Sequence, residues 1–274
     1  MSIDVKAYMA ALGDTPYTRL KALMKTLRAP GGCPWDAEQS FADIARYTIE
    51  EAYEVADAIA KNDMDHLREE LGDLLFQTVF HSRIAEEAGA FNLDDVADDL
   101  TAKMIRRHPH VFGDESERSA DEQVEAWEAL KAKERAQKAA PNASILDDVA
   151  LALPALMRAE KLQKRAARVG FDWPNLDGVL DKITEEASEV AQAAQNQDTD
   201  ATEDEIGDLL FAVTNLARKL GVDPEVALRR TNDKFARRFK YVEAGAKTDG
   251  KALPDMSLEE MDALWDKAKI EERN

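Results

Sequence analysis

The sequence has few of the residues that build disulfides, sheets or membrane spans. Its 274 residues include one cysteine, Cys33, which excludes an internal disulfide and a cysteine-based metal cluster. Only 12 glycines and 9 prolines interrupt the chain, and aromatic residues make up 7%, so strands and their turns have little material. No run approaches the ~18 apolar residues that a membrane span needs. The first ten residues lack the basic and apolar regions of an export signal, so we expect a cytoplasmic protein without membrane contact.

Positive charge is also scarce. The chain has 36 Lys and Arg against 55 Asp and Glu, a net charge of −19, which repels a phosphate backbone, so no nucleic-acid polymer is expected as a partner. Hydrophobic residues make up 45% and charged residues 33%, which is typical of a globular protein. Ala, Glu, Leu, Asp and Lys dominate, and these residues favour helices. We therefore predict an all-α fold.

An internal repeat divides the chain. Residues 50–54 read EEAYE and residues 185–189 read EEASE, while residues 70–76 read ELGDLLF and residues 205–211 read EIGDLLF. The same spacing separates every matched pair of acidic residues, and a register shared by four acidic positions is improbable by chance. The chain is therefore predicted to hold two tandem copies of one helical unit.

The joint between the copies is predicted near residue 140. Pro141 disfavours a helix before it, and Ser144 with Asp147 resembles the capping signal of a helix that opens the second copy. We assign residues 1–140 to an N-terminal repeat and residues 141–274 to a C-terminal repeat.

Apolar periodicity and capping signals predict the helices within each copy. We expect them at residues 40–61, 65–88, 94–107, 176–195, 201–220 and 224–238, with a last helix after Ser257 that carries Trp265. Neither copy alone has enough amphipathic helices for a comfortable bundle. We therefore expect the copies to pair, within a chain or between chains.

Four carboxylates of the second copy are expected to lie close together. Glu186 and Glu189 share one helix face, as do Glu205 and Asp208, and antiparallel helices would bring the two pairs together. Their mutual repulsion is relieved most simply by a divalent cation that prefers oxygen, Mg²⁺ or Mn²⁺. The alternative is that these glutamates form solvated helix faces, but the repetition of the pattern in register argues against it.

Basic residues near these carboxylates point to an anionic ligand. Lys182 lies four residues before Glu186, and Lys234 and Arg238 are also four apart, so each pair shares a helix face. A triphosphate bridged by Mg²⁺ to the carboxylates would suit this set, and Trp265 could stack on a base. Taken singly, each basic residue is explained better by a surface ion pair, and Trp265 is explained better as a core residue.

The Glu-Glu-x-x-Glu and Glu-x-x-Asp pattern, with Cys33-Pro-Trp35-Asp36 ahead of the first copy, resembles the MazG family over nearly the whole chain. The resemblance implies an all-α nucleoside triphosphate pyrophosphohydrolase that uses Mg²⁺ to release a nucleoside monophosphate and pyrophosphate. Such an enzyme would serve house-cleaning or control of the nucleotide pool. Members commonly form homodimers that share helices across the interface, which fits the incomplete bundle.

The resemblance also assigns residues. In the second copy it implies metal ligands at Glu186, Glu189, Glu205 and Asp208, and nucleotide contacts at Lys182, Glu185, Lys234, Arg238 and Trp265. Either Glu185 or a metal-bound glutamate would accept the proton of the attacking water.

The first copy keeps the same ligand set, Glu51, Glu54, Glu70 and Asp73, but has Tyr47 where the second has Lys182. That difference weakens phosphate binding, so we expect the second copy to be the main hydrolytic site. The first is then either a second metal site or a regulatory and structural unit. A rival hypothesis is a nucleotide-sensing or partner-binding helical module with a structural cation, which would bind a triphosphate without releasing pyrophosphate.

Overall fold

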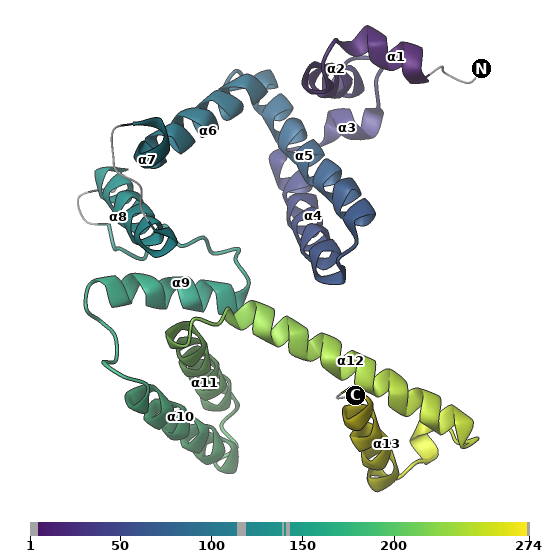
Figure 1. Cartoon of the computed structure of the whole chain (residues 1–274), viewed down its shortest axis with the longest axis vertical. Coiled ribbons are helices and arrows are strands. Elements are labelled where there is room, and N and C mark those ends of the chain that lie inside the picture. Colours follow the sequence, from purple (N-terminus) through teal and green to yellow (C-terminus); the bar gives the residue numbers. More distant parts are fainter. Residues whose placement is uncertain (1–4, 114–118, 139, 141–142, 273–274) are drawn as a thin grey trace. The chain divides into compact units, whose positions relative to one another are not determined.

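The computed structural model of the chain describes residues 5–113, 119–138, 140 and 143–272. It contains two compact units, Met1–Lys138 and Ala139–Asn274. Every regular element of the described residues is a helix, so the predicted all-α class is confirmed (Figure 1). Within the same residues, no helix combines the length and the apolar character that crossing a bilayer requires.

The first unit is built around a long helical hairpin formed by α4 and α5. Its helices are α1 (Val5–Leu12), α2 (Pro16–Arg28), α3 (Pro34–Glu38), α4 (Phe41–Lys61), α5 (Met64–Glu87), α6 (Leu93–Arg107), α7 (Pro109–Phe112) and α8 (Ala120–Lys138). Side-chain caps set where the helices begin: Ser40 starts α4, Asp63 starts α5 and Asn92 starts α6. The three helices predicted in this unit form within one residue of their expected bounds.

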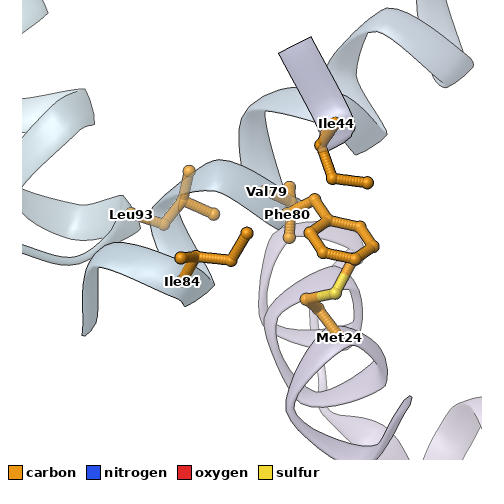
Figure 2. Close-up of a cluster of buried hydrophobic side chains, with 6 residues drawn as sticks. All are labelled: Met24, Ile44, Val79, Phe80, Ile84 and Leu93. Atoms are coloured by element: carbon orange, nitrogen blue, oxygen red, sulfur yellow. The ribbon is translucent and has the colours of Figure 1, made fainter. Parts of the chain in front are cut away.

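The core of the first unit lies where α2, α4, α5 and α6 meet. Figure 2 shows the Phe80 ring between Met24 and Ile44, with Ile84 facing Leu93 on the other side. Phe80 is 1% exposed, and truncating such a ring to Ala typically costs about 3–5 kcal/mol of folding free energy. This core fixes α4 against α5, the two helices that carry the first set of carboxylates.

The second unit repeats the hairpin with α10 and α11. Its helices are α9 (Ala155–Arg168), α10 (Asp177–Gln195), α11 (Thr199–Lys219), α12 (Pro224–Thr248), the 3₁₀ turn η1 (Leu253–Asp255) and α13 (Leu258–Glu271). A second apolar cluster joins α12 to α13 through Val242, Ala246, Met256 and Leu264. Figure 1 shows α13 alongside the C-terminal half of α12.

Two local predictions for the second unit were wrong. The helix expected to end at Arg238 continues to Thr248, because Val242 and Ala246 bury an apolar face against α13. Ser144 and Asp147 do form capping hydrogen bonds, with Ser144 N donating to Asp147 Oδ2 at 2.7 Å. Only turns follow them, and the next helix begins after Pro154.

The repeat extends further along the chain than the sequence patterns had indicated. In the first unit, Glu134 of α8 pairs with Arg106 and Arg107 at the end of α6. In the second, Glu272 pairs with Arg237 and Arg238 of α12. A tryptophan lies seven residues before each of these glutamates. Both units therefore attach their last helix by placing a carboxylate on two adjacent arginines.

Candidate functional site

The carboxylates of the second unit converge on the α10–α11 hairpin. One oxygen each of Glu186, Glu205 and Asp208 lies within 4.8 Å of the other two. The three come from facing helices, with Glu186 on α10 and the other two on α11. Spacing of three residues along α11 places Glu205 and Asp208 on one face, so the hairpin itself builds the cluster.

Glu189 lies at the edge of this cluster. Burial raises the pKa of its carboxyl above the ordinary value, and the charges of Glu205 and Glu186 raise it further. A raised pKa means that the folded chain disfavours another negative charge at this point. All four residues predicted as ligands therefore lie in one electrostatically coupled group.

Glu186 gives the strongest sign that the group holds a ligand. Its side chain is almost wholly buried, and its Oε2 has no hydrogen-bond partner among the described residues. A buried, unsatisfied carboxylate oxygen is costly, whereas a hard divalent cation would supply the missing interaction. The oxygen-only donor set fits Mg²⁺ or Mn²⁺.

Lys182 and Glu185 adjoin the carboxylates on α10. The Lys182 Nζ lies 2.6 Å from Glu186 Oε1 and 3.0 Å from Glu185 Oε1. These hydrogen bonds raise the pKa of Lys182, so the ammonium is fully charged at neutral pH. The Lys182 ammonium thus partly neutralises the carboxylates. Its flexible side chain can turn away from them to bind an anionic ligand.

The remaining predicted nucleotide contacts form a separate group on α12 and α13. Arg238 pairs with Glu272 at 2.7 Å, and its guanidinium lies 5.7 Å from the centre of the Trp265 ring. Phe235 packs against the same ring at 5.1 Å, and Lys234 lies one turn before Arg238. Within one chain these side chains belong to a different helix pair from the carboxylates.

The first unit carries a matching cluster on α4 and α5. Oxygens of Glu51, Glu70 and Asp73 lie within 4.8 Å of one another. Burial raises the pKa of Glu51, and the charges of Asp73 and Glu54 raise it further, so Glu54 belongs to the group as Glu189 does in the second unit. Here the neighbouring basic group is His66, whose Nε2 lies 2.7 Å from Glu70 Oε1.

Comparison with known families decides the identity of the fold. The model of the MazG nucleotide pyrophosphohydrolase domain matches residues 39–112 and, a second time, residues 176–243. The chain belongs to the MazG family. The two matches confirm the predicted tandem repeat, and each contains one carboxylate hairpin.

Relatives along nearly the whole chain carry related names. A nucleoside triphosphate pyrophosphohydrolase of Escherichia coli is 51% identical over 257 residues, covering 93% of this chain and 97% of that protein. The nucleoside triphosphate pyrophosphohydrolase/pyrophosphatase MazG of Thermotoga maritima is 44% identical over 253 residues, covering 92% and 95%. The resemblance to the MazG family drawn from the acidic motifs is therefore confirmed.

The sequence patterns did not reveal every polar group at the MazG sites. Gln77 and His66 approach the first cluster, and Glu272 is the partner of Arg238. A repeat search that allowed another shift in register would have aligned Trp127 with Trp265 and hence Glu134 with Glu272. Gln77 and His66 gave no such signal, because their counterparts in the second repeat are alanines.

Proposed function

We propose that the second MazG repeat hydrolyses nucleoside triphosphates to nucleoside monophosphates and pyrophosphate. The observation that carries the proposal is the cluster of Glu186, Glu205 and Asp208, in which a buried carboxylate oxygen lacks a partner. The family match and the names of the relatives support the same reaction. The physiological role we infer is house-cleaning or control of the nucleotide pool.

Mg²⁺, with Mn²⁺ as a substitute, is the cation that we assign to Glu186, Glu189, Glu205 and Asp208. Bound there, it would neutralise charge on the phosphate chain and favour ionisation of a water molecule. The oxygen-only donor set and the unpartnered oxygen of Glu186 support this assignment.

The side chains of the repeat have distinct tasks in this proposal. Lys182 leaves its glutamate partners and binds phosphate oxygens, which holds the triphosphate in line for attack by water. Glu185 accepts the proton of that water, because its carboxylate lies beside Lys182 but outside the three-oxygen cluster. Its proton then passes to solvent, since the Glu185 side chain is exposed.

We further propose that the active form is a homodimer. Leu180, Ile206, Leu210 and Phe235 are large apolar side chains left exposed on the helices of the second unit. Lys234, Arg238 and Trp265 lie on a different helix pair from the carboxylates of their own chain. A second copy of the chain would cover the apolar faces and supply these three side chains to the nucleotide.

The proposed reaction is tested by Glu186→Gln and Asp208→Asn. Each substitution keeps the shape of the side chain but removes a charge from the cluster, so Mg²⁺-dependent release of pyrophosphate should fall by at least a hundredfold. Far-UV circular dichroism should remain that of the unaltered chain. Normal hydrolysis by either variant would contradict the assignment of the site.

Product analysis separates hydrolysis from sensing. A nucleotide-sensing or partner-binding module with a structural cation would bind the triphosphate and release no pyrophosphate. A panel of ordinary, deoxy and damaged nucleoside triphosphates, assayed with Mg²⁺, would also identify the preferred base and sugar.

A further inference from the structure

The α10–α11 hairpin of the second unit is held together at both of its ends. A short turn joins the two helices at one end, where α10 ends at Gln195 and α11 begins at Thr199. At the other end, the loop that leads into α10 carries Asp172, and α11 ends with Arg218 and Lys219. Arg218 Nη2 donates to Asp172 Oδ1 at 2.6 Å, and Lys219 Nζ donates to Asp172 Oδ2 at 3.0 Å. Along the hairpin, the carboxylate cluster lies between the turn and this ionic contact.

The ionic contact is largely removed from water. The side chains of Arg218, Lys219 and Asp172 are 11%, 14% and 23% exposed. Burial opposes the charge of Asp172, but hydrogen bonds from Arg218 and Lys219 outweigh this effect and lower the pKa of the carboxyl below its ordinary value. Arg218 also donates to Oδ1 of the buried Asn215. Removal of one partner from a buried ion pair leaves an uncompensated charge, so Asp172 is needed to hold both cations in place.

Trp173 extends the contact to the first turn of α10. Lys219 Nζ donates to the carbonyl oxygen of Trp173 as well as to the neighbouring carboxylate. The Trp173 ring packs on Gly178, where a Cβ would clash with the ring. Gly178, Lys182 and Glu186 follow one another at intervals of four residues, so they share one face of α10. The end of α11 therefore holds the part of α10 that leads to Lys182 and Glu186.

The first unit closes its hairpin at the same end with different residues. Arg28, whose side chain is 6% exposed, donates to the carbonyl oxygens of Asp36 and Gln39, in the segment that leads into α4. The same guanidinium pairs at 2.8 Å with Glu87, the last residue of α5. Both units thus tie the entry of the first hairpin helix to the end of the second helix, although the residues that do so differ. This repetition indicates that each hairpin needs to be held at the end opposite its turn.

We propose that Asp172 is a positioning residue for the hydrolytic site, which holds α10 against the end of α11 and so keeps Glu186 opposite Asp208. Arg218 lies ten residues after Asp208, roughly 15 Å along α11, so Asp172 acts through the helices. A divalent cation requires ligand oxygens from both helices in a fixed geometry, and splaying of the hairpin would separate them. The inference rests on the proposed function, because it takes this cluster to hold a divalent cation.

The first measurement is Mn²⁺ binding to the full chain carrying Glu70→Gln, in which the cluster of the first unit is weakened. Electron paramagnetic resonance should show that adding Asp172→Asn weakens Mn²⁺ binding by roughly tenfold, since loss of groups that orient the ligands typically costs this much affinity. Asp172→Glu keeps the charge and should retain most of the affinity. If the Glu70→Gln chain itself binds no Mn²⁺, the proposed function fails and the inference fails with it.

Asp148→Asn is the matched control. Asp148 also pairs with an arginine of the second unit, Arg165 of α9, but this pair lies outside the hairpin, so the substitution should leave Mn²⁺ affinity unchanged. Unchanged Mn²⁺ affinity in Asp172→Asn, with or without a lower thermal midpoint, would overturn the inference and leave the proposed function standing. An equal loss of affinity in Asp148→Asn would also overturn it, because general loosening of the unit would then be the cause.

The Mg²⁺ dependence of hydrolysis gives a second readout. In the Glu70→Gln chain, Asp172→Asn should raise the Mg²⁺ concentration for half-maximal pyrophosphate release by roughly tenfold, and saturating Mg²⁺ should recover most of kcat. A purely structural role would lower the thermal midpoint without moving this concentration.

Lys219→Met tests the same contact if Asp172→Asn does not fold. It removes one cation and the hydrogen bond to the Trp173 carbonyl oxygen, but it leaves Asp172 paired with Arg218. We expect Mn²⁺ binding to weaken severalfold in the folded variant. Unchanged affinity in this variant would overturn the inference.

Discussion

Lys182 marks a clear difference between the two repeats beside their carboxylate clusters. It pairs with Glu185 and Glu186, and Tyr47 replaces it in the first repeat. We expect Lys182→Ala to reduce kcat/KM for nucleoside triphosphates at least tenfold, because a phosphate contact is lost. Steady-state kinetics with Mg²⁺ would measure the loss. Lys240→Ala, an exposed lysine on α12, serves as the control.

An unchanged kcat/KM for Lys182→Ala would show that the lysine only balances the charge of its neighbours. Thermal midpoints should also be compared, since the ion pair is partly exposed and such pairs contribute little to stability.

Residue positions were predictable where helix geometry alone decides them. Spacings of three and four residues place Glu205 beside Asp208 and Lys182 beside Glu186, and both pairs form. Burial and long-range partners were not predictable in this way. The unpartnered oxygen of Gln77 and the pairing of Arg238 with Glu272 depend on how separate helices pack, and the local sequence carries no trace of that packing.

At the scale of elements, α8 is attached to α6 by charge. Arg107 and Arg106 hydrogen-bond to Glu134 and lower the pKa of its carboxyl to about 2. Because the folded pKa lies below the unfolded value of about 4.5, the stabilisation is complete above pH 4.5 and is lost as the pH falls toward 2. We expect Glu134→Gln to lower the thermal midpoint at pH 7, with a difference that shrinks below pH 4.5.

Differential scanning calorimetry from pH 7 to pH 3 would follow this difference. Glu243→Gln, on the exposed face of α12, should give no pH-dependent difference. A constant gap between the unaltered chain and Glu134→Gln over the whole range would contradict the ionic attachment.

Helix bounds followed local capping signals closely, except after Ser144 and at the end of α12. Ser40, Asp63 and Asp198 cap their helices, so the starts of α4, α5 and α11 were predicted within two residues. The end of α12 was missed, because it depends on Val242 and Ala246 packing against α13. Packing overrode the local tendency to stop near Arg238.

For the whole molecule, the proposed homodimer makes a prediction about mixed subunits. Glu186→Gln disables the carboxylates, and Arg238→Ala disables the α12–α13 group. If a second copy supplies that group, each variant alone should be nearly inactive. A mixture, unfolded and refolded together, should regain activity in heterodimers that combine one intact carboxylate cluster with one intact Arg238.

Pyrophosphate release by the mixture, compared with each variant refolded alone, would measure this complementation. A mixture of the Glu186→Gln variant and the Asp208→Asn variant, refolded together in the same way, serves as the matched control. Both changes lie in the same carboxylate cluster, so these two variants should not complement each other. Analytical ultracentrifugation would show whether the mixture of Glu186→Gln and Arg238→Ala is dimeric. If a dimeric mixture regained no activity, the proposal that two chains share one active site would be contradicted.

In both units, a glutamate paired with two adjacent arginines attaches the last helix. This shared feature bears on how the two halves of a duplicated gene can diverge. Glu134 and Glu272 perform the same structural task, whereas Tyr47 and Lys182 do not share a chemical one. The two glutamates that attach the last helices are thus separate from the two carboxylate clusters. After duplication, mutations could retune one half for a new duty while its inherited framework, and the working sister half, remained intact.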